Sequence, residues 1–434
     1  MLQIPGARSL PFSSPSRIRA TQDRRVRSIV AHAYRTVPFY GRIMDERGMR
    51  PGDFQTAADL ARLPLVSGQD LARDPQLFLS TAAAAEPLLE VTSSGSSGHA
   101  KRLYWDRAAV FRARAAGVRQ REVLARFLGP WHGYRTLAVS RRGGTLDVVR
   151  SFHAAYSIVP ARLDVKPVGV HPEDSFEHNL EVINSIEPDL IIGFGAYIGA
   201  VYRWAHVHGR TIFCPRLVAY GGEQLPPADR ELLETTYGIP VLSSYQSCEA
   251  LRIAFQCPHR NVFHVHADQV ALRIADVNGE TQPAGERGQI VISNLINRAT
   301  VLLNYAIGDL GVMADASCPC GRNLPALASL DGRADDLVTL PNGELAHDSV
   351  LLAELYGVAG VIRVQLVQET RYRFRIRVVH RSALPDRALR EQLTQALVRV
   401  VGREEVEVHV DILDELASAP SGKFQSIVSH VRDS

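Results

Sequence analysis

The sequence predicts an α/β protein with a large N-terminal domain and a small α+β C-terminal domain. From Thr136 onward, short β-rich runs alternate with helical ones, which is the pattern of βαβ units on a largely parallel sheet. The tail after Arg333 instead holds two strand-like runs, a helix and a further strand. A chain of 434 residues is also too long for one ordinary core. We therefore expect one domain over residues 1–333 and a second over residues 334–434, with parallel and mixed sheets and helices in the first.

The individual elements follow from periodicity and turn residues. Before residue 100 the pattern is mainly helical, as over Arg24–Tyr34, where Pro38 ends the helix. The expected strands of the parallel sheet are residues 137–139, 157–159, 190–192, 216–219 and 240–242, and the helices between them include residues 176–186 and 228–237. After residue 262, strands 270–275 and 288–292 form a hairpin with Asn278-Gly279 as its turn. The tail is expected to form strands 361–366, 372–379 and 406–410 and a helix over residues 385–401.

Composition excludes several classes of function. The 49 basic and 46 acidic residues are too evenly balanced to indicate a nucleic-acid partner. The most apolar run, Leu190 to Trp204, contains three glycines and an arginine and is too short for a membrane span. An odd number of cysteines, five, argues against a disulfide framework and for a reducing, cytoplasmic location.

The most distinctive motif is the loop Val91-Thr-Ser-Ser-Gly-Ser-Ser-Gly98, followed by Lys101. Glycines let backbone N–H groups wrap a phosphate, and the hydroxyls add donors. The spacing differs from that of P-loop nucleotidases. Taken alone, the loop fits a flexible Ser/Gly linker equally well.

Three further motifs follow strand-like runs. Tyr220-Gly-Gly-Glu-Gln-Leu225 suits the approach of a flat ring to the backbone, or a tight turn. Ser243-Ser-Tyr-Gln-Ser-Cys-Glu249 ends on a carboxylate that either holds Mg²⁺ or is simply exposed. Asn304-Tyr-Ala-Ile-Gly-Asp309 places an aspartate to accept from ribose hydroxyls, or to cap a turn. Asp331-Gly-Arg-Ala-Asp-Asp336 and Pro420-Ser-Gly-Lys423 complete the series.

In this order, the motifs resemble those of the adenylate-forming superfamily of acyl-CoA synthetases, peptide-synthetase adenylation domains and luciferases. Ile29-Val-Ala-His-Ala-Tyr-Arg-Thr-Val-Pro-Phe-Tyr40 and Leu60-Ala-Arg-Leu-Pro-Leu65 resemble the start of phenylacetate–CoA ligases and their capsule-biosynthesis relatives. The resemblance implies an enzyme that uses ATP to convert an acid to its acyl-AMP and then, with CoA, to a thioester. An aryl or arylacetyl acid is expected, and a homodimer is consistent with the resemblance.

The resemblance also implies residue roles. The β- and γ-phosphates would lie on Ser93, Ser94, Gly95, Ser96, Ser97 and Gly98, with Lys101 nearby. Gly221, Gly222, Glu223 and Tyr245 would border the adenine, Glu249 would bind Mg²⁺, and Asp309 and Arg333 would hold the ribose. The acid pocket would be lined by Tyr197, Tyr220, Gln246, Ser247 and Cys248. The tail domain would be mobile: it would rotate about Asp335 or Asp336 and bring Lys423 to the acid and the α-phosphate.

Some positions depart from the family pattern. His99-Ala100 replace the usual Lys-Pro, and Asn304 stands where arginine is usual. Gln246 and Cys248 replace Gly and Thr, which leaves the identity of the acid open. The final acceptor is open too: an amine or a carrier-protein thiol could replace CoA. A non-catalytic nucleotide-binding relative and a zinc-dependent hydrolase are the alternatives from other classes.

A structural zinc site is expected beside these motifs. Cys318-Pro-Cys320 on a tight turn, together with Cys257 and His264 upstream, supplies the four N/S donors that a closed zinc site requires. His259 competes with His264 for the histidine position. The alternative is a buried thiol pair with loop histidines.

Overall fold

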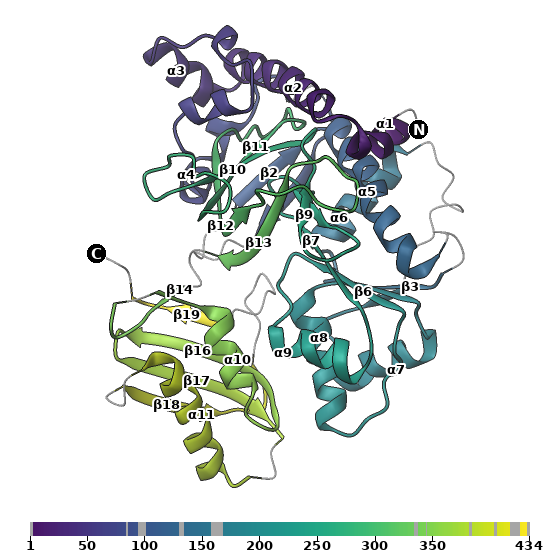
Figure 1. The fold of residues 1–434 in the computed structure, drawn as a ribbon, viewed down its shortest axis with the longest axis vertical. Coiled ribbons are helices and arrows are strands. Elements are labelled where there is room, and N and C mark those ends of the chain that lie inside the picture. Colours follow the sequence, from purple (N-terminus) through teal and green to yellow (C-terminus); the bar gives the residue numbers. More distant parts are fainter. Residues whose placement is uncertain are drawn as a thin grey trace. The chain divides into compact units, whose positions relative to one another are not determined.

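The computed structural model (Figure 1) describes residues 3–83, 86–93, 101–129, 134–157, 168–333, 337–343, 345–381, 384–402, 406–416 and 426–431. The chain divides into two compact units, each formed from separate segments of sequence. The first unit contains Met1–Gly133, Arg142–Lys166 and Ser243–Asp331, and the second contains Tyr134–Arg141, Pro167–Leu242 and Gly332–Ser434. None of the helices in the described residues combines the length and apolar character that crossing a bilayer requires.

The N-terminal part of the first unit is helical. Its elements are α1 (Gln3–Ser9), η1 (Leu10–Phe12), α2 (Pro15–Thr36), α3 (Pro38–Glu46), η2 (Pro51–Asp53), η3 (Ala58–Arg62), α4 (Gly68–Arg73) and η4 (Pro75–Phe78). Helix α2 begins at Pro15 because Ser14 caps it, accepting a hydrogen bond from the Arg17 N–H group at 3.4 Å. Pro38 ends α2 as expected. It also begins α3, since proline suits the first turn of a helix.

The rest of the first unit is β-rich. Strands β1 (Leu89–Ser93) and β2 (Lys101–Trp105) form an antiparallel pair. The larger sheet has the order β10-β11-β12-β13-β9-β8-β7. Its strands are β7 (Val241–Tyr245), β8 (Ala254–Gln256), β9 (Phe263–Val265), β10 (Val270–Ala275), β11 (Arg287–Asn294), β12 (Tyr305–Met313) and β13 (Ala326–Arg333), and the helices are α5 (Arg107–Leu128) and α6 (Thr145–Tyr156).

The predicted hairpin forms, but its turn differs from the prediction. Strands β10 and β11 pair antiparallel, from Val270 opposite Asn294 to Ala275 opposite Gln289. Asn278-Gly279 closes only a local turn, in which Gly279 donates to the Asp276 carbonyl at 3.1 Å. Further residues follow before β11 begins, so Asn-Gly is not the whole connection. The prediction assigned the whole connection to Asn278-Gly279. The reason for the error is that Asn-Gly favours any tight turn with positive φ.

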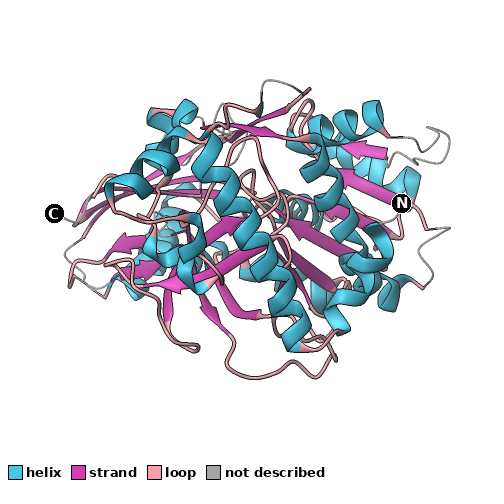
Figure 2. Cartoon of the chain, turned by 90° about the horizontal axis from the view of Figure 1, so that it is seen from above, coloured by secondary structure: helices cyan, strands magenta, loops and turns pink. Residues whose placement is uncertain are grey.

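The second unit contains the predicted parallel sheet. Strands β3 (Thr136–Val139), β4 (Val168–Val170), β5 (Leu190–Gly193) and β6 (Leu217–Gly221) have the order β6-β5-β3-β4, and all described pairs are parallel. The connecting helices are α7 (Phe176–Ile186), α8 (Gly195–Val207) and α9 (Pro227–Glu231), and a π-helical turn, η7 (Leu232–Thr236), extends α9. Helices and strands can be followed in Figure 2. Ser157 lies outside any strand, and the rest of the predicted strand 157–159 lies outside the described residues.

The C-terminal domain has a mixed sheet of its own, in the order β18-β17-β16-β19. Its elements are β14 (Leu337–Thr339), β15 (Leu345–His347), α10 (Asp348–Tyr356), β16 (Val361–Thr370), β17 (Arg373–His380), α11 (Asp386–Val401), β18 (Glu407–Ile412) and β19 (Ile427–Ser429). The three predicted strands and the helix are present. Helix α10 was missed because its apolar residues do not gather on one face.

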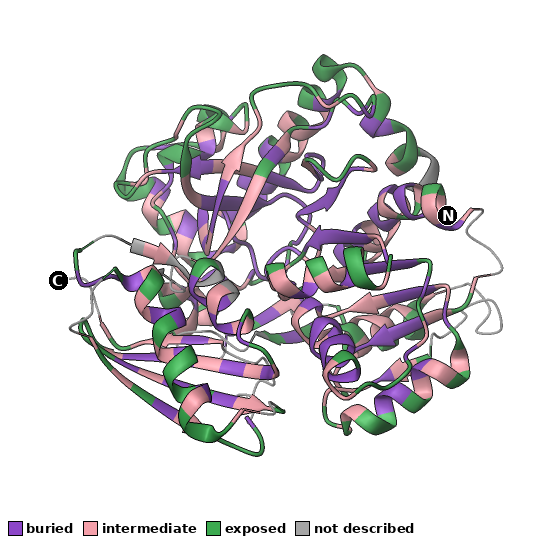
Figure 3. Cartoon of the chain, turned by 60° about the horizontal axis from the view of Figure 1, so that its bottom comes forward, coloured by how far each residue is buried: buried purple, intermediate pink, exposed green. Residues whose placement is uncertain are grey.

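This domain also has its own apolar core. Leu366, Phe374 and Ile376 of the sheet and Leu393 and Leu397 of α11 are fully buried in one cluster. Figure 3 shows buried residues along the strands and exposed residues on the helix faces. The fold class predicted from the sequence is confirmed. The proposed boundary at residues 333 and 334 stays a prediction.

We expect Phe374→Ala to lower the free energy of unfolding of the C-terminal domain by about 3–5 kcal/mol, because it leaves a cavity in this core. Urea unfolding measured by circular dichroism tests this. Tyr372→Ala is the matched control, since Tyr372 is 45% exposed and should cost under about 0.5 kcal/mol. Equal losses for the two variants would contradict the assignment of the core.

Candidate active site

The first unit brings a lysine, a glutamate and a tyrosine together. Lys101 begins β2, Glu249 follows β7 and Tyr305 begins β12. Lys101 Nζ donates to Glu249 Oε1 at 2.8 Å and lies 3.1 Å from the Tyr305 hydroxyl, which donates to the same Oε1 at 3.2 Å. The three side chains, far apart in sequence, thus form one hydrogen-bonded cluster.

The Lys101 ammonium and the Glu249 carboxylate neutralise each other in the interior of the protein. The Lys101 side chain is 9% exposed and that of Glu249 5%. Burial opposes the ionised form of Glu249, but the Lys101 ammonium and hydrogen bonds from Lys101 and Ser247 outweigh it and lower the pKa of Glu249. The carboxylate therefore stays ionised at neutral pH, as a cation ligand must.

Gly68 of α4 completes the wall of this cluster. A Cβ atom at Gly68 would lie 3.2 Å from Lys101 Nζ and 3.4 Å from the Tyr305 hydroxyl oxygen. The absence of a side chain here leaves room for the ammonium group. Sequence reasoning did not identify this role, because it depends on the approach of Gly68 to Lys101 and Tyr305, which are distant in the chain.

Tyr245 and Asp309 form a second pair in the first unit. The Tyr245 hydroxyl donates to Asp309 Oδ2 at 2.6 Å. Asp309 follows Gly308, whose φ of 89° favours glycine and turns the strand at this point. Two residues predicted to contact one nucleotide are therefore in direct contact within the first unit.

Asn304, which departs from the family pattern, has a structural role. Its φ is 51°, a conformation that asparagine tolerates better than most residues. Its Nδ2 donates to the Leu63 carbonyl at 2.7 Å, and its Oδ1 accepts from Arg273 Nε and Nη2 at 3.2 and 2.9 Å. The side chain is thus used to hold the start of β12 in place.

The segment expected to line the acid pocket lies beside α6. Cys248 Sγ is 3.8 Å from Thr145 Oγ1, and the Cys248 carbonyl accepts from the Trp105 indole at 3.1 Å. Gln246 Nε2 donates to Ser244 Oγ at 2.8 Å, and Ser247 is partly buried. Thr145 was missed by sequence reasoning because no motif surrounds it.

The remaining described candidates belong to the second unit. Tyr197, on α8, accepts from Asn179 Nδ2 at 2.6 Å, and burial raises the pKa of Tyr197 to about 12. The Tyr220 hydroxyl accepts from Arg230 Nη2 at 2.9 Å. Gly222 has a φ of 80°, and a Cβ atom there would contact the Phe194 ring at 3.5 Å. Gly221 ends β6, and Arg333 ends β13.

Glu223 lines a small cavity of about 30 Å³ together with Phe194 and Tyr197. The tyrosine and the glutamate are therefore neighbours within the second unit. Several other predicted residues lie outside the described residues: Ser94 to Gly98, Lys423, the hinge candidates Asp335 and Asp336, and the side chain of Ser93.

The predicted metal ligands gather in the first unit. Cys257, His264 and Cys318 offer ligand atoms that all lie within 4.8 Å of one another. His264 Nε2 is 3.1 Å from Cys320 Sγ, which adds the fourth group. His264 is fully buried, whereas His259 is exposed. Of the two histidines, His264 is the one placed beside the cysteines.

The chain is similar in sequence to known proteins. Residues 339–430 match the family model of the CapK C-terminal domain. The chain is 25% identical to phenylacetate–coenzyme A ligase of Thermus thermophilus over 93% of its length and 87% of the relative. It is 26% identical to that of Aromatoleum evansii, over 76% of this chain and 73% of the relative.

Solved structures show the same fold. A 2-hydroxyisobutyryl-CoA ligase in its postadenylation state superposes with a TM-score of 0.78 at 19% identity, covering 98% of this chain and 91% of that one. In its thioesterification state the score is 0.65 at 20% identity, covering 98% and 92%. The fold is therefore that of the adenylate-forming ligases. The predicted resemblance to phenylacetate–CoA ligases is confirmed by the sequence relatives.

We expect Asn304→Ala to lower the free energy of unfolding by about 2 kcal/mol or more. The change strands the buried Leu63 carbonyl and the Arg273 guanidinium and places alanine at positive φ. Thermal and urea unfolding measure the loss. Asn278→Ala, at an exposed turn, is the control and should change stability little. If the two variants are equally stable, the structural role assigned to Asn304 is wrong.

Proposed function

We propose that this protein is an ATP-dependent ligase that converts a carboxylic acid to its acyl-AMP and then to its CoA thioester. The observation that carries the proposal is the buried Lys101–Glu249–Tyr305 cluster in a chain with this fold. A purely structural protein gains little from an ion pair that must be desolvated at this position. The relatives named phenylacetate–CoA ligases favour an aryl or arylacetyl acid.

The proposed chemistry has two steps. In the first, a carboxylate oxygen of the acid attacks the α-phosphorus of ATP, the bond to the bridging oxygen breaks, and pyrophosphate leaves. In the second, the CoA thiol loses its proton and its sulfur attacks the acyl carbon, so that AMP leaves. Both anions of the first step must approach each other, which makes neutralisation of charge the main task of the site.

The residues present fit this task. Glu249 is ionised and buried, so it is suited to hold Mg²⁺, which would neutralise phosphate charge. Lys101, now paired with Glu249, would contact the phosphates, together with the loop from Ser93 to Gly98. Asp309 and Arg333 would hold the ribose, and Gly221, Gly222 and Glu223 would border the adenine with Tyr245.

The lysines of the sequence support these roles. Lys101, Lys166 and Lys423 are the only lysines, although the chain has 49 basic residues. Two of the three stand in the recognised motifs. A lysine is a compact point charge with movable donors, which suits a phosphate that changes geometry during the reaction. We propose that Lys423 contacts the acid and the α-phosphate when the domain of residues 334–434 rotates about Asp335 or Asp336.

We expect ATP–pyrophosphate exchange that depends on an aryl or arylacetyl acid. Lys423→Ala and Glu249→Gln should each lower the exchange rate by about 10²-fold or more, because each removes charge stabilisation from the transition state. Exchange of labelled pyrophosphate measures this. Lys166→Ala is the matched control and should exchange at the wild-type rate.

Full exchange by the Lys423→Ala variant, or no exchange with any acid in a broad panel, would refute the adenylation step. The acceptor is tested separately in the same preparation. Acyl-CoA should form when CoA is added, as followed by liquid chromatography. If acyl-AMP forms but CoA does not react, adenylation stands and the acceptor is an amine or a carrier-protein thiol.

We also propose a structural Zn²⁺ held by Cys257, His264, Cys318 and Cys320. Two observations support it: the spacing of the ligand atoms and the burial of His264. Three cysteine thiolates and one histidine imidazole are a common ligand set of structural zinc sites. The group would fix the turn around Gly321, where φ is 80°.

Purified protein should contain one equivalent of zinc by mass spectrometry. Cys320→Ser and His264→Ala should lose most of it, because a closed site needs all four ligands. His259→Ala and Cys214→Ser are the controls, since both residues are exposed and Cys214 lies outside the cluster. Wild-type protein without zinc, or loss of zinc in the His259 variant instead, would overturn the ligand set.

Two further proposals concern the location of the protein in the cell and its oligomeric state. A cytoplasmic location is supported by five free cysteines. A homodimer is supported by the family resemblance alone, and light scattering distinguishes it from a monomer of 47.8 kDa.

A further inference from the structure

The carboxylate assigned to Mg²⁺ already has a positive group on it. Lys101 Nζ lies 2.8 Å from Glu249 Oε1, and the Tyr305 hydroxyl donates to the same oxygen at 3.2 Å. A carboxylate oxygen accepts along about two lone-pair directions, so these two donors use the capacity of Oε1. The roles proposed above, Lys101 on the phosphates and Glu249 on Mg²⁺, therefore require this pair to open.

The second oxygen of Glu249 does not remove the conflict. A divalent ion on Oε2 would lie close to the Lys101 ammonium, and like charges repel strongly where burial limits screening by water. Magnesium sites commonly combine one or two protein carboxylates with phosphate oxygens of the substrate. A single carboxylate that an ammonium group already neutralises attracts a free ion only weakly. Lys101 and a metal ion thus compete for Glu249.

Of the two partners, Lys101 is the one that can move. The Glu249 backbone is fixed, because its carbonyl accepts from Asn294 Nδ2 at 2.9 Å. The lysine ammonium instead lies at the end of a flexible four-carbon chain. Lys101 is paired with Ser93 across β1 and β2, at the two ends of the loop assigned to the β- and γ-phosphates. The ammonium can therefore exchange a carboxylate partner for a phosphate partner without movement of the strands.

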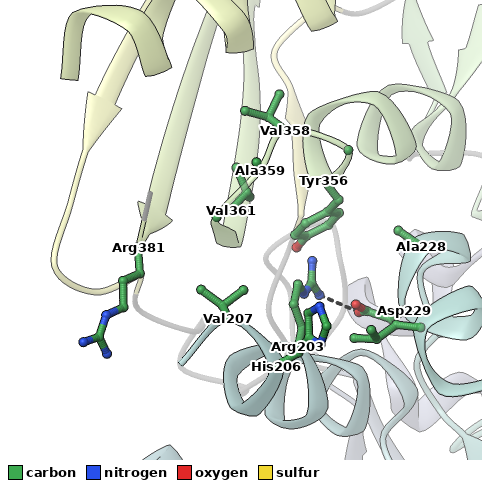
Figure 4. Close-up of a pocket in the computed structure, with 13 residues that line it drawn as sticks. Arg203, His206, Val207, Ala228, Asp229, Tyr356, Val358, Ala359, Val361 and Arg381 are labelled. Atoms are coloured by element: carbon green, nitrogen blue, oxygen red, sulfur yellow. Dashed lines mark hydrogen bonds and ion pairs between the residues drawn. The ribbon is translucent and has the colours of Figure 1, made fainter. Parts of the chain in front are cut away.

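A buried ion pair of the second unit is held more firmly. Arg203 donates to Asp229, and the Tyr356 ring lies over the guanidinium, with the Cζ atom 3.9 Å from the ring centroid (Figure 4). The rigid guanidinium is thus fixed both in its plane and on one face. In the first unit the Tyr305 ring centroid lies 5.8 Å from Lys101 Nζ, which is a looser contact. The two pairs differ in the way expected of a permanent pair and an exchangeable one.

We propose that Lys101 is a placeholder cation, which closes Glu249 to metal ions until ATP binds and its phosphates draw the ammonium away. The inference rests on the proposed function for the roles of the two residues. Its consequence is that a metal ion enters only together with the nucleotide, so that Glu249 is never left as an uncompensated buried charge. Tyr305 keeps its hydrogen bond to Oε1 in both arrangements and acts as the positioning residue of the carboxylate.

The test is titration of the full-length protein with Mn²⁺, in the absence of ATP and acid, followed by electron paramagnetic resonance. Mn²⁺ prefers the same oxygen ligands as Mg²⁺ and can be observed directly. Lys101→Gln removes the charge but keeps an N–H donor for Glu249. Lys101→Gln combined with Glu249→Gln shows whether an ion that binds is bound by this carboxylate. Arg102→Gln is the matched control, since the neighbouring Arg102 side chain is 66% exposed.

We expect Lys101→Gln to bind Mn²⁺ at least about 10-fold more tightly than wild type and the Arg102→Gln control, because the competing charge is gone. The double variant should lose this gain. Mn²⁺ should also raise the Tm of Lys101→Gln and leave that of wild type unchanged, since the ion then compensates a buried carboxylate only in the variant.

Tyr305→Phe separates charge from hydrogen bonding. It removes a donor from Oε1 but leaves the ammonium, so its affinity for Mn²⁺ should stay as weak as that of wild type. Tight binding of Mn²⁺ to wild type without ATP, or equal affinity in wild type and Lys101→Gln, overturns the proposal. ATP–pyrophosphate exchange is measured separately. If Lys101→Gln gains Mn²⁺ but wild type shows no exchange, the ligase function fails and the placeholder role of Lys101 stands.

Discussion

The buried ion pair of Lys101 and Glu249 sets the geometry of the first unit. The two residues are 148 positions apart, and Tyr305, 56 positions further, bonds to the same carboxylate oxygen. Neither charge can be left alone in the interior, so the strands that carry them must meet. The arrangement brings β2, the segment after β7 and the start of β12 together at one point.

Two buried arginines, Arg119 and Arg203, are likewise paired with buried carboxylates. Arg119, which is fully buried, donates to Asp268 at 2.7 Å, lies 2.9 Å from His266 Nδ1, and binds the Ala7 carbonyl at 2.8 Å. Those bonds connect the N-terminal helix to the sheet of its unit. Arg203 has one acidic partner and a tyrosine, and it lines a cavity. Each of the two arginines is thus paired with a buried carboxylate.

The sequence and the structure agree most closely where local pattern decides the outcome. The parallel strands around Leu190 and Leu217 were predicted because fully buried strands require short apolar runs between turn residues. The pairing of Tyr245 with Asp309 was not predictable as a contact, although both residues were recognised. Thr145, Gly68 and Asn179 were missed altogether, since each acts through a neighbour that is distant in sequence.

The surroundings of two residues that depart from the family pattern are known only from the tertiary structure. Asn304 stands where arginine is usual in the family motif. Its positive φ and its bonds to Leu63 and Arg273 give it instead a role in the backbone. Cys248 lies beside Thr145, so α6 borders the segment that was expected to line the acid pocket.

The sequence by itself determined the fold class, the order of the motifs and the set of candidate metal ligands, because these depend on residue type and local spacing. Tertiary structure decided which of those side chains meet. It placed His264, and not His259, beside the cysteines, and it paired Lys101 with Glu249. The physical reason is that burial and pairing of charge depend on contacts between segments far apart in the chain, which local spacing does not encode.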